Sequence, residues 1–145
     1  MQLNGAALAT DIRDDMILDL RNIIEGWEYE PGKISVRKII GQDGREKIQT
    51  RVDLGVLQFE VAGRPDGARP HGFDSMLGYY ESRLREHVEK FGGEAGFQLN
   101  SDDCKELRHE GHLFYQRFLS HFVLEEFGSV ESDTARNLRL LDGCH

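Results

Sequence analysis

The segment from Lys33 to Val61 alternates apolar and polar side chains on both sides of a short polar turn. This pattern is typical of an antiparallel β-hairpin. A two-residue loop would place apolar residues opposite polar ones, whereas a three-residue loop, Gln42 to Gly44, pairs Gly41 with Arg45 and keeps both faces consistent. Such a loop needs a left-handed residue at its last position, which Gly44 supplies.

In this register Ser35 lies opposite Arg51, and Arg37 lies opposite Gln49. One face of the hairpin is then apolar, and the other is polar and mostly basic. After Gly55 the apolar phase changes, which predicts a β-bulge there. The basic face supplies our candidate binding residues, which are Lys33, Arg37, Lys47 and Arg51.

Before the hairpin, Thr10 or Asp11 caps a predicted helix that Gly26 ends, and residues 1–9 form a loose leader. After turns near residues 63–72, three amphipathic helices follow. Gly111 lies within the second of these, so we expect a neighbouring helix to approach closely there. The predicted caps and stops are Asp74 or Ser75 and Gly92-Gly93 for the first helix, Asn100 and Gly128 for the second, and Ser129 for the third.

Together these elements predict one α+β domain of 145 residues. It comprises an N-terminal helix, an antiparallel hairpin or small sheet, and a three-helix C-terminal half. The helix and hairpin occupy residues 10–67, and the helical part occupies residues 73–142.

The formal net charge of −8 argues against a chain that binds nucleic acid or a membrane surface with its whole exterior. Residues 33–69, however, hold eight basic and five acidic groups between acidic neighbours. We expect this charge to complement the flanking acidic helices more than to form a partner site. Two cysteines without a spaced framework and the lack of a long apolar run predict a soluble cytoplasmic protein with reduced thiols.

A histidine-rich stretch of the second long helix raises the question of a metal site. Glu106 and His109 match half of a di-iron motif, which only a symmetric dimer could complete. His109 and His112 are three residues apart, whereas a zinc protease motif requires four. We therefore predict no metal and no cofactor, and the weak candidate ligands are Glu106, His109 and His112.

Catalytic residues are not predicted either. Cys104 lies on a packing stripe, where a free cysteine usually acts as a small hydrophobe. No serine stands in a nucleophile-elbow context, and no glycine turn ends as a phosphate loop does. The aromatic residues Phe114, Tyr115, Phe118 and Phe122 are expected in a packed helical core rather than in a cofactor site.

Two parts of the sequence resemble known protein families. Residues 30–67 and 109–142 resemble the N-terminal region of uncharacterised bacterial proteins that are labelled by a C-terminal UvrB/UvrC (UVR) motif. That motif is a helical hairpin that mediates protein contacts in excision repair, and its own Ala-Ala-x-Leu-Arg-like helix is absent from this chain. Phe127 to Leu140 is similar to the second helix of a tetratricopeptide repeat, although Thr134 and Asn137 depart from its pattern.

The last amphipathic helix has no further segment to pack against. We expect a downstream domain missing from this chain, an oligomer, or a terminal helix docked on the core. The leading functional hypothesis is a non-enzymatic protein-interaction module in a larger or oligomeric assembly. The alternatives are a nucleic-acid-associated module that uses the basic face and, third, a metal-binding helical protein.

Overall fold

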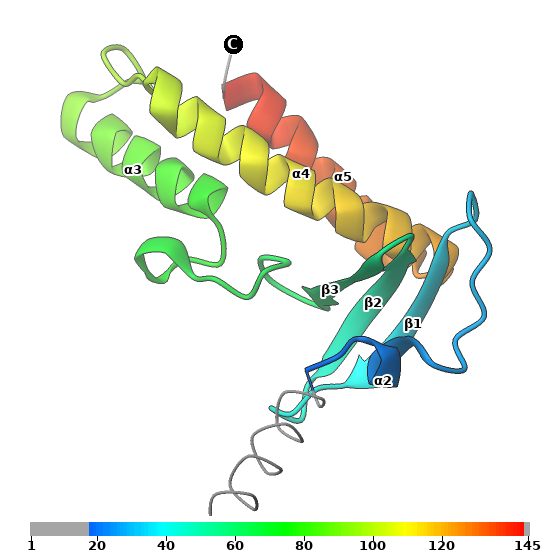
Figure 1. Ribbon diagram of the computed structural model, residues 1–145. Coiled ribbons are helices and arrows are strands. Elements are labelled where there is room, and N and C mark those ends of the chain that lie inside the picture. Colours follow the sequence, from blue (N-terminus) through cyan, green and yellow to red (C-terminus); the bar gives the residue numbers. More distant parts are fainter. Residues whose placement is uncertain (1–17, 144–145) are drawn as a thin grey trace, which may run out of the picture.

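The computed structural model describes residues 18–143 and has the predicted α+β architecture (Figure 1). A three-stranded antiparallel sheet lies beside a group of three long helices. The predicted leader and the expected start of the first helix at Thr10 lie outside the described residues. The elements are α2 (Arg21–Ile24), β1 (Ser35–Ile40), β2 (Glu46–Val52), β3 (Gly55–Glu60), η1 (Pro70–Gly72), α3 (Met76–Phe91), α4 (Ser101–Val123) and α5 (Phe127–Gly143).

The predicted register of the hairpin is confirmed. Ser35 pairs with Arg51, and Arg37 pairs with Gln49. The Gly41 N–H donates to the Arg45 carbonyl oxygen at 2.8 Å, which closes the predicted three-residue loop. Gly44 has a φ of 78°, the left-handed conformation that this loop requires. The strand order is β1-β2-β3.

The predicted bulge at Gly55 is wrong. Val52 pairs directly with Gly55, and the two residues between them form a turn. Gly55 is therefore the first residue of β3. The change of apolar phase that predicted a bulge arises because the chain reverses and starts a new strand. On the apolar face, Phe59 of β3 pairs with Ile48 of β2, and both side chains are buried.

The predicted helix caps at Ser75 and Asn100 and the predicted helix stop at Gly92 are confirmed. Ser75 Oγ accepts a hydrogen bond from the Gly78 N–H at 3.0 Å, and Gly92 ends α3 with a φ of 78°. Asn100 and Asp103 form a reciprocal capping box, with distances of 2.8 and 3.0 Å. Each interaction satisfies a backbone N–H that has no partner within its own helix.

The break between the last two helices is not at Gly128, as predicted, but three residues earlier. Glu125 adopts a φ of 61°, and the Glu126 N–H donates to the His121 carbonyl oxygen at 2.9 Å. The chain thus turns immediately after α4. Gly128 lies inside the first turn of α5, where no left-handed residue is needed. Ser129, the predicted cap of this helix, lies inside the same turn, so that prediction is wrong too.

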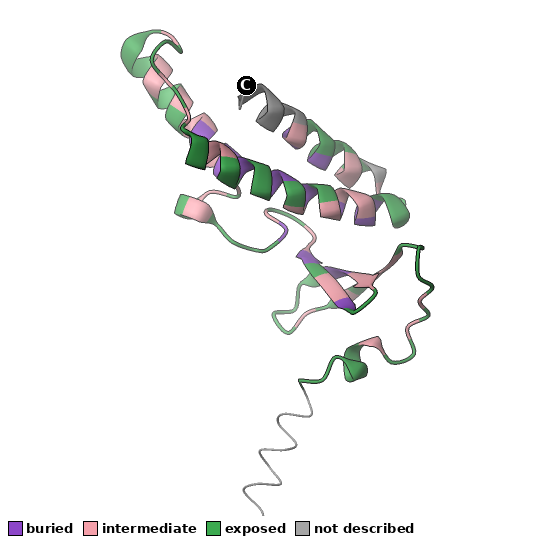
Figure 2. Cartoon of the chain, turned by 45° about the horizontal axis from the view of Figure 1, so that its top comes forward, coloured by how far each residue is buried: buried purple, intermediate pink, exposed green. Residues whose placement is uncertain are grey.

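Helix α4 is the centre of the fold. Its Leu107 packs in a buried cluster with Met76, Leu77 and Tyr80 of α3. On the sheet side, Thr50 Oγ1 and Ser120 Oγ share a hydrogen bond of 2.7 Å. Figure 2 shows buried residues along α4 and in the neighbouring strands.

The expected close approach at Gly111 is confirmed. Asn137 Nδ2 of α5 donates to the Gly111 carbonyl oxygen at 3.3 Å. A side chain of the neighbouring helix thus reaches the backbone in the middle of α4, at a glycine that is itself buried.

Candidate functional site

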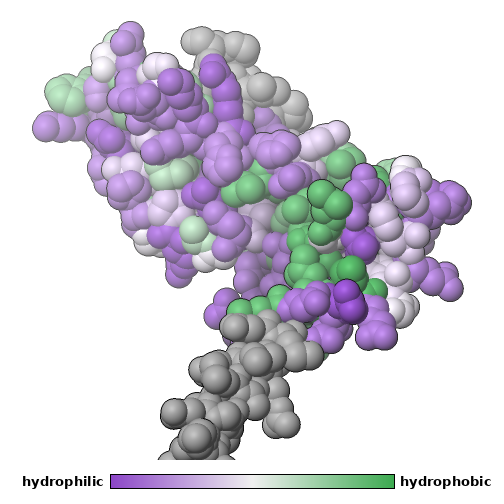
Figure 3. Space-filling view, viewed as in Figure 1, coloured by the Kyte–Doolittle hydropathy of each residue, from purple (hydrophilic) through white to green (hydrophobic). Residues whose placement is uncertain are grey.

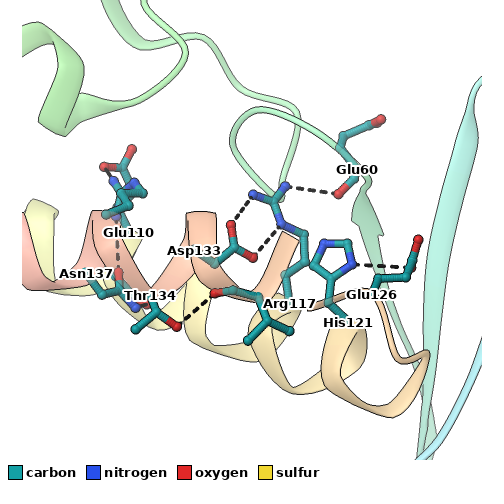
Figure 4. A network of polar contacts seen from close by, with 11 residues as sticks. Glu60, Glu110, Arg117, His121, Glu126, Asp133, Thr134 and Asn137 are labelled. Atoms are coloured by element: carbon teal, nitrogen blue, oxygen red, sulfur yellow. Dashed lines mark hydrogen bonds and ion pairs between the residues drawn. The ribbon is translucent and has the colours of Figure 1, made fainter. Parts of the chain in front are cut away.

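The contact between α4 and α5 contains a network of buried charged side chains (Figure 4). Buried charges are tolerated only when they are paired and hydrogen-bonded. The members are Glu110, Arg117, His121, Asp133 and Arg136.

Glu110 lies at the N-terminal end of α3, although it belongs to α4. It is 0% exposed. Its two carboxylate oxygens accept hydrogen bonds from the Met76 N–H at 2.7 Å and from the Leu77 N–H at 3.2 Å. The same carboxylate forms ion pairs with Arg136 and, at 3.6 Å, with Arg64. Glu110 thus supplies the negative charge that a helix N-terminus favours.

Arg117 joins three elements. Its Nε and Nη2 atoms donate to the two carboxylate oxygens of Asp133 at 3.2 and 2.9 Å. Its Nη1 donates to the backbone oxygen of Glu60 at the end of β3, at 3.1 Å. The Phe114 ring lies 4.9 Å from the Arg117 guanidinium and 3.7 Å from that of Arg136. Both cations therefore have an aromatic face as well as a carboxylate partner.

A second polar link joins the end of α4 to the sheet. His121 is buried and its Nδ1 lies 3.4 Å from Glu126 Oε1, while Lys38 of β1 donates to Glu126 Oε2 at 2.5 Å. Burial pushes the pKa of Glu126 upward. The hydrogen bonds from Lys38 and His121 together outweigh this effect and hold the pKa below its ordinary value.

These contacts give the network a structural role. The carboxylates of Glu110 and Asp133 are both engaged by arginines, and both lie inside the contact between helices. The network holds α3, α5 and the sheet to α4. Because these buried charges are engaged with one another, the residues that can contact a ligand or partner are those on the surface of this scaffold.

The four predicted binding residues of the basic face have partners within the chain. Lys33 pairs with Glu30 at 2.8 Å. Arg37 donates to Gln49 and to the Ile23 carbonyl oxygen, each at 2.8 Å. Lys47 and Arg51 also have partners within the chain.

Lys47 is buried between Asp43, at 2.7 Å, and Glu60. Hydrogen bonds from Lys47 to these two carboxylates raise the lysine's pKa. Arg51 donates to the Val52 and Gly55 carbonyl oxygens. These contacts support the internal role that we expected for the basic face, although most partners lie in the hairpin itself rather than in the flanking helices.

Two aromatic rings cover the arginines of this face. The Trp27 ring lies 3.9 Å from the Arg37 guanidinium, and the Tyr29 ring lies 4.6 Å from that of Arg51. Trp27 Nε1 also donates to Ser35 Oγ at 2.8 Å. The sequence interpretation missed these rings because they come from the segment before the hairpin.

The weak metal candidates lie on the exposed side of α4. Glu106, His109 and His112 are all exposed. Within residues 18–143, no three side chains of the types that ligate metals come together in a possible site.

Aromatic side chains of α4 divide between the inside and the outside of the molecule. Phe114 is buried, but Tyr115 is 50% exposed and Phe122 is 57% exposed. Tyr115 stacks on the partly buried Phe118, with ring centroids 5.9 Å apart and planes 15° apart. Our expectation that all four rings pack in a core is therefore wrong. We call Tyr115, Phe118 and Phe122 the aromatic stripe.

Further apolar side chains are exposed on the sheet side of the molecule. They include Ile34, Ile40 and Leu54. Figure 3 shows apolar side chains gathered where α4 meets the sheet. In the part of the chain that the structure describes, no helix is long and apolar enough to cross a membrane.

Comparisons with known proteins add no relative. No protein-family model, no curated protein and no solved structure matches this chain. The resemblances to the UVR-labelled proteins and to a tetratricopeptide helix stay predictions.

Proposed function

We propose that this chain is a non-enzymatic protein-interaction module and that the aromatic stripe of α4 is its contact surface. The observation that carries this proposal is the exposure of Tyr115 and Phe122, which lie two turns apart on α4 with the partly buried Phe118 between them. Single exposed apolar residues are ordinary on protein surfaces. Aromatic residues grouped on one rigid face are instead typical of interface centres.

The scaffold beneath the stripe supports the same conclusion. Glu110 and Arg117 fix α4 to α3, α5 and the sheet through buried ion pairs and hydrogen bonds. Because α4 is held in place from its inner side, the stripe is presented without further ordering of the backbone. A preformed surface loses less conformational entropy when it binds.

Site-specific photo-crosslinking in cells that produce the protein tests this proposal. A photoreactive phenylalanine analogue replaces Tyr115 in one variant and the exposed Arg85 of α3 in a matched control. We expect a discrete crosslinked protein species from position 115 and none from position 85. Equal crosslinking at both positions, or none at position 115, would contradict the proposal.

A further inference from the structure

The strand β1 forms one edge of the sheet, because the strand order is β1-β2-β3 (Figure 1). Residues opposite each other in an antiparallel pair alternate between hydrogen-bonded pairs and pairs whose N–H and C=O groups point away from the partner strand. The bond from the Gly41 N–H to the Arg45 carbonyl oxygen fixes this alternation for the hairpin. It directs the N–H and C=O groups of Val36, Lys38 and Ile40 outward, away from β2. These three residues form a row of main-chain donors and acceptors, which we call the open edge.

The open edge has no main-chain partner in the described part of the chain. Among residues 18–143, no group hydrogen-bonds to the outward N–H and C=O groups of the three residues. The preceding segment, residues 25–34, does not pair with β1, since its backbone–backbone hydrogen bonds stay within itself and α2. The edge of β3 differs. There the Glu60 N–H donates to the Pro65 carbonyl oxygen at 2.9 Å, and Arg117 donates to the Glu60 carbonyl oxygen at 3.1 Å.

The side chains of β1 do not guard the open edge. Edge strands are commonly protected by proline, by a bulge or by lysine side chains. β1 holds no proline, and its register with β2 is continuous over all six residues. The side chain of its lysine, Lys38, is held by Glu126. Ile40, two residues further along, is 66% exposed. The edge is therefore open to pairing and carries an exposed apolar side chain.

We infer that the open edge binds an extended segment of another protein, which adds to the sheet as a fourth strand beside β1. An extended backbone matches the edge, because it presents donors and acceptors at the same spacing. The side chains of the edge add a preference. The segment should place branched apolar residues opposite Val36 and Ile40 and no cation opposite Lys38. This surface lies on a different element from the aromatic stripe, so the inference goes beyond the proposed function.

A second copy of this chain fits the open edge less well. A twofold antiparallel pairing that uses all three positions must have its axis at Lys38, the middle of the row. It would therefore place Lys38 of one copy opposite Lys38 of the other. Like charges directly opposite each other destabilise a sheet. A segment of another protein avoids this repulsion, because its residue opposite Lys38 can be neutral or acidic.

Peptide selection against the full chain tests this inference. The probe is a phage-displayed library of random peptides of about seven residues, a usual length for a strand. A selected peptide is then synthesised with a fluorescent label, and its affinity is measured by anisotropy. Hydrogen exchange, measured by NMR with and without this peptide, shows which backbone amides it protects.

Three variants separate main-chain pairing from side-chain contacts. Ile40→Pro removes one outward N–H but no hydrogen bond of the β1–β2 ladder, and edge strands tolerate proline at such positions. Ile40→Val keeps this N–H and a branched apolar side chain. Gln58→Pro is the matched control, because the same alternation directs the Gln58 N–H outward from the opposite edge of the sheet. Circular dichroism confirms that each variant is folded.

We expect selected peptides with branched apolar residues at alternate positions. Bound peptide should slow the exchange of the Val36, Lys38 and Ile40 amides, which have no hydrogen-bond partner in the free chain. Affinity for Ile40→Pro should fall by about tenfold, since one main-chain hydrogen bond to the peptide is lost. Ile40→Val should lose far less affinity than Ile40→Pro, and Gln58→Pro should bind as the wild type does.

The inference would be overturned if no peptide is selected, or if the selected peptides bind Ile40→Pro as tightly as the wild type. Unchanged exchange of the three amides in the complex would also overturn it, even if Ile40→Pro proved unable to fold. A wild-type dimer that forms through β1 would make a second copy the occupant and sink the inference. Peptides that bind Ile40→Pro normally but not Tyr115→Ala would support the proposed function and exclude the open edge, so the two proposals fail separately.

Discussion

Arg117 and Asp133 face each other across the contact between α4 and α5, and the guanidinium donates two hydrogen bonds to the carboxylate. Arg117 is 3% exposed and Asp133 is 4% exposed. A buried pair of this kind contributes modestly as a whole, because both charges lose their hydration. Removal of one partner is far more costly, because the other charge stays buried without compensation.

Replacement of Asp133 by alanine should therefore destabilise the protein strongly. We expect a loss of about 3–5 kcal/mol in the free energy of unfolding, because Arg117 would keep a buried charge without a carboxylate. Urea denaturation measures this loss. Glu131→Ala is the control, since Glu131 is an exposed acid of the same helix. Equal urea midpoints for the two variants would contradict the predicted role of Asp133.

Glu110→Gln should loosen the start of α3. The amide keeps the shape of the side chain but removes the charge that faces Arg136 and caps the Met76 N–H. We expect a loss of roughly 3 kcal/mol, together with faster hydrogen exchange of the Met76 and Leu77 amides. The exposed Glu106→Gln, one turn earlier in α4, should change neither quantity. Unchanged exchange at Met76 in Glu110→Gln would disprove the capping role.

Asp103 should make stability depend on acidic pH. Hydrogen bonds from the Tyr80 hydroxyl and from the Asn100 N–H hold the Asp103 pKa below its ordinary value. A carboxyl whose pKa is lowered by folding contributes stability above its unfolded pKa of about 3.9. That contribution is lost as the pH falls from there through the folded pKa.

The melting temperature measured from pH 7 down to about pH 2 tests this contribution. The decline on acidification should be smaller in Asp103→Asn than in the wild type. Asp102→Asn should decline as the wild type does, because the Asp102 side chain is exposed and its nearest cation, Lys105, is 3.9 Å away. If the melting temperature fell equally on acidification in Asp103→Asn and in the wild type, this prediction would be refuted.

Trp27 is the only tryptophan in the chain. Its fluorescence therefore reports directly on the contact between its ring and Arg37 on the basic face. Arg37→Gln removes the guanidinium that lies 3.9 Å from the ring centroid. We expect the emission of Trp27 to shift and stability to fall by about 1 kcal/mol. Lys33→Gln should leave the emission unchanged, because Lys33 pairs only with the surface residue Glu30 in the described contacts. Identical spectra for Arg37→Gln and the wild type would rule out the stacking.

Several local features could be predicted from the sequence because each is determined by nearby residues. The hairpin register follows from parity and from Gly44, and the caps at Ser75 and Asn100 follow from side chains that reach their own helix. The turn between β2 and β3 was not predicted, because local pattern alone does not identify it. A phase change at Gly55 fits both a bulge and a reversal, and only the pairing with Val52 distinguishes them.

The buried network could not be predicted from local pattern, because charged residues are usually solvated. A signal was nevertheless present. Leu107, Glu110, Phe114, Arg117 and His121 follow the alternating three- and four-residue spacing of a helix–helix seam. The charged members of that seam give no sign of burial in the sequence, because charged side chains usually face solvent. Their partners on α5 could be known only from the tertiary contact.

Phe114 and Tyr115 are neighbours in α4, but Phe114 is buried whereas Tyr115 is half exposed, as the proposed contact surface requires. Urea denaturation of Phe114→Ala and Tyr115→Ala at dilute protein concentration shows whether the two rings differ in their contribution to stability. We predict a loss of about 3–5 kcal/mol for Phe114→Ala, whose ring is buried and contacts two arginines. For Tyr115→Ala we predict a loss of about 1 kcal/mol or less, because half of its surface is already exposed. A loss for Tyr115→Ala as large as that for Phe114→Ala would show that the aromatic stripe is part of the core and would overturn the proposed function.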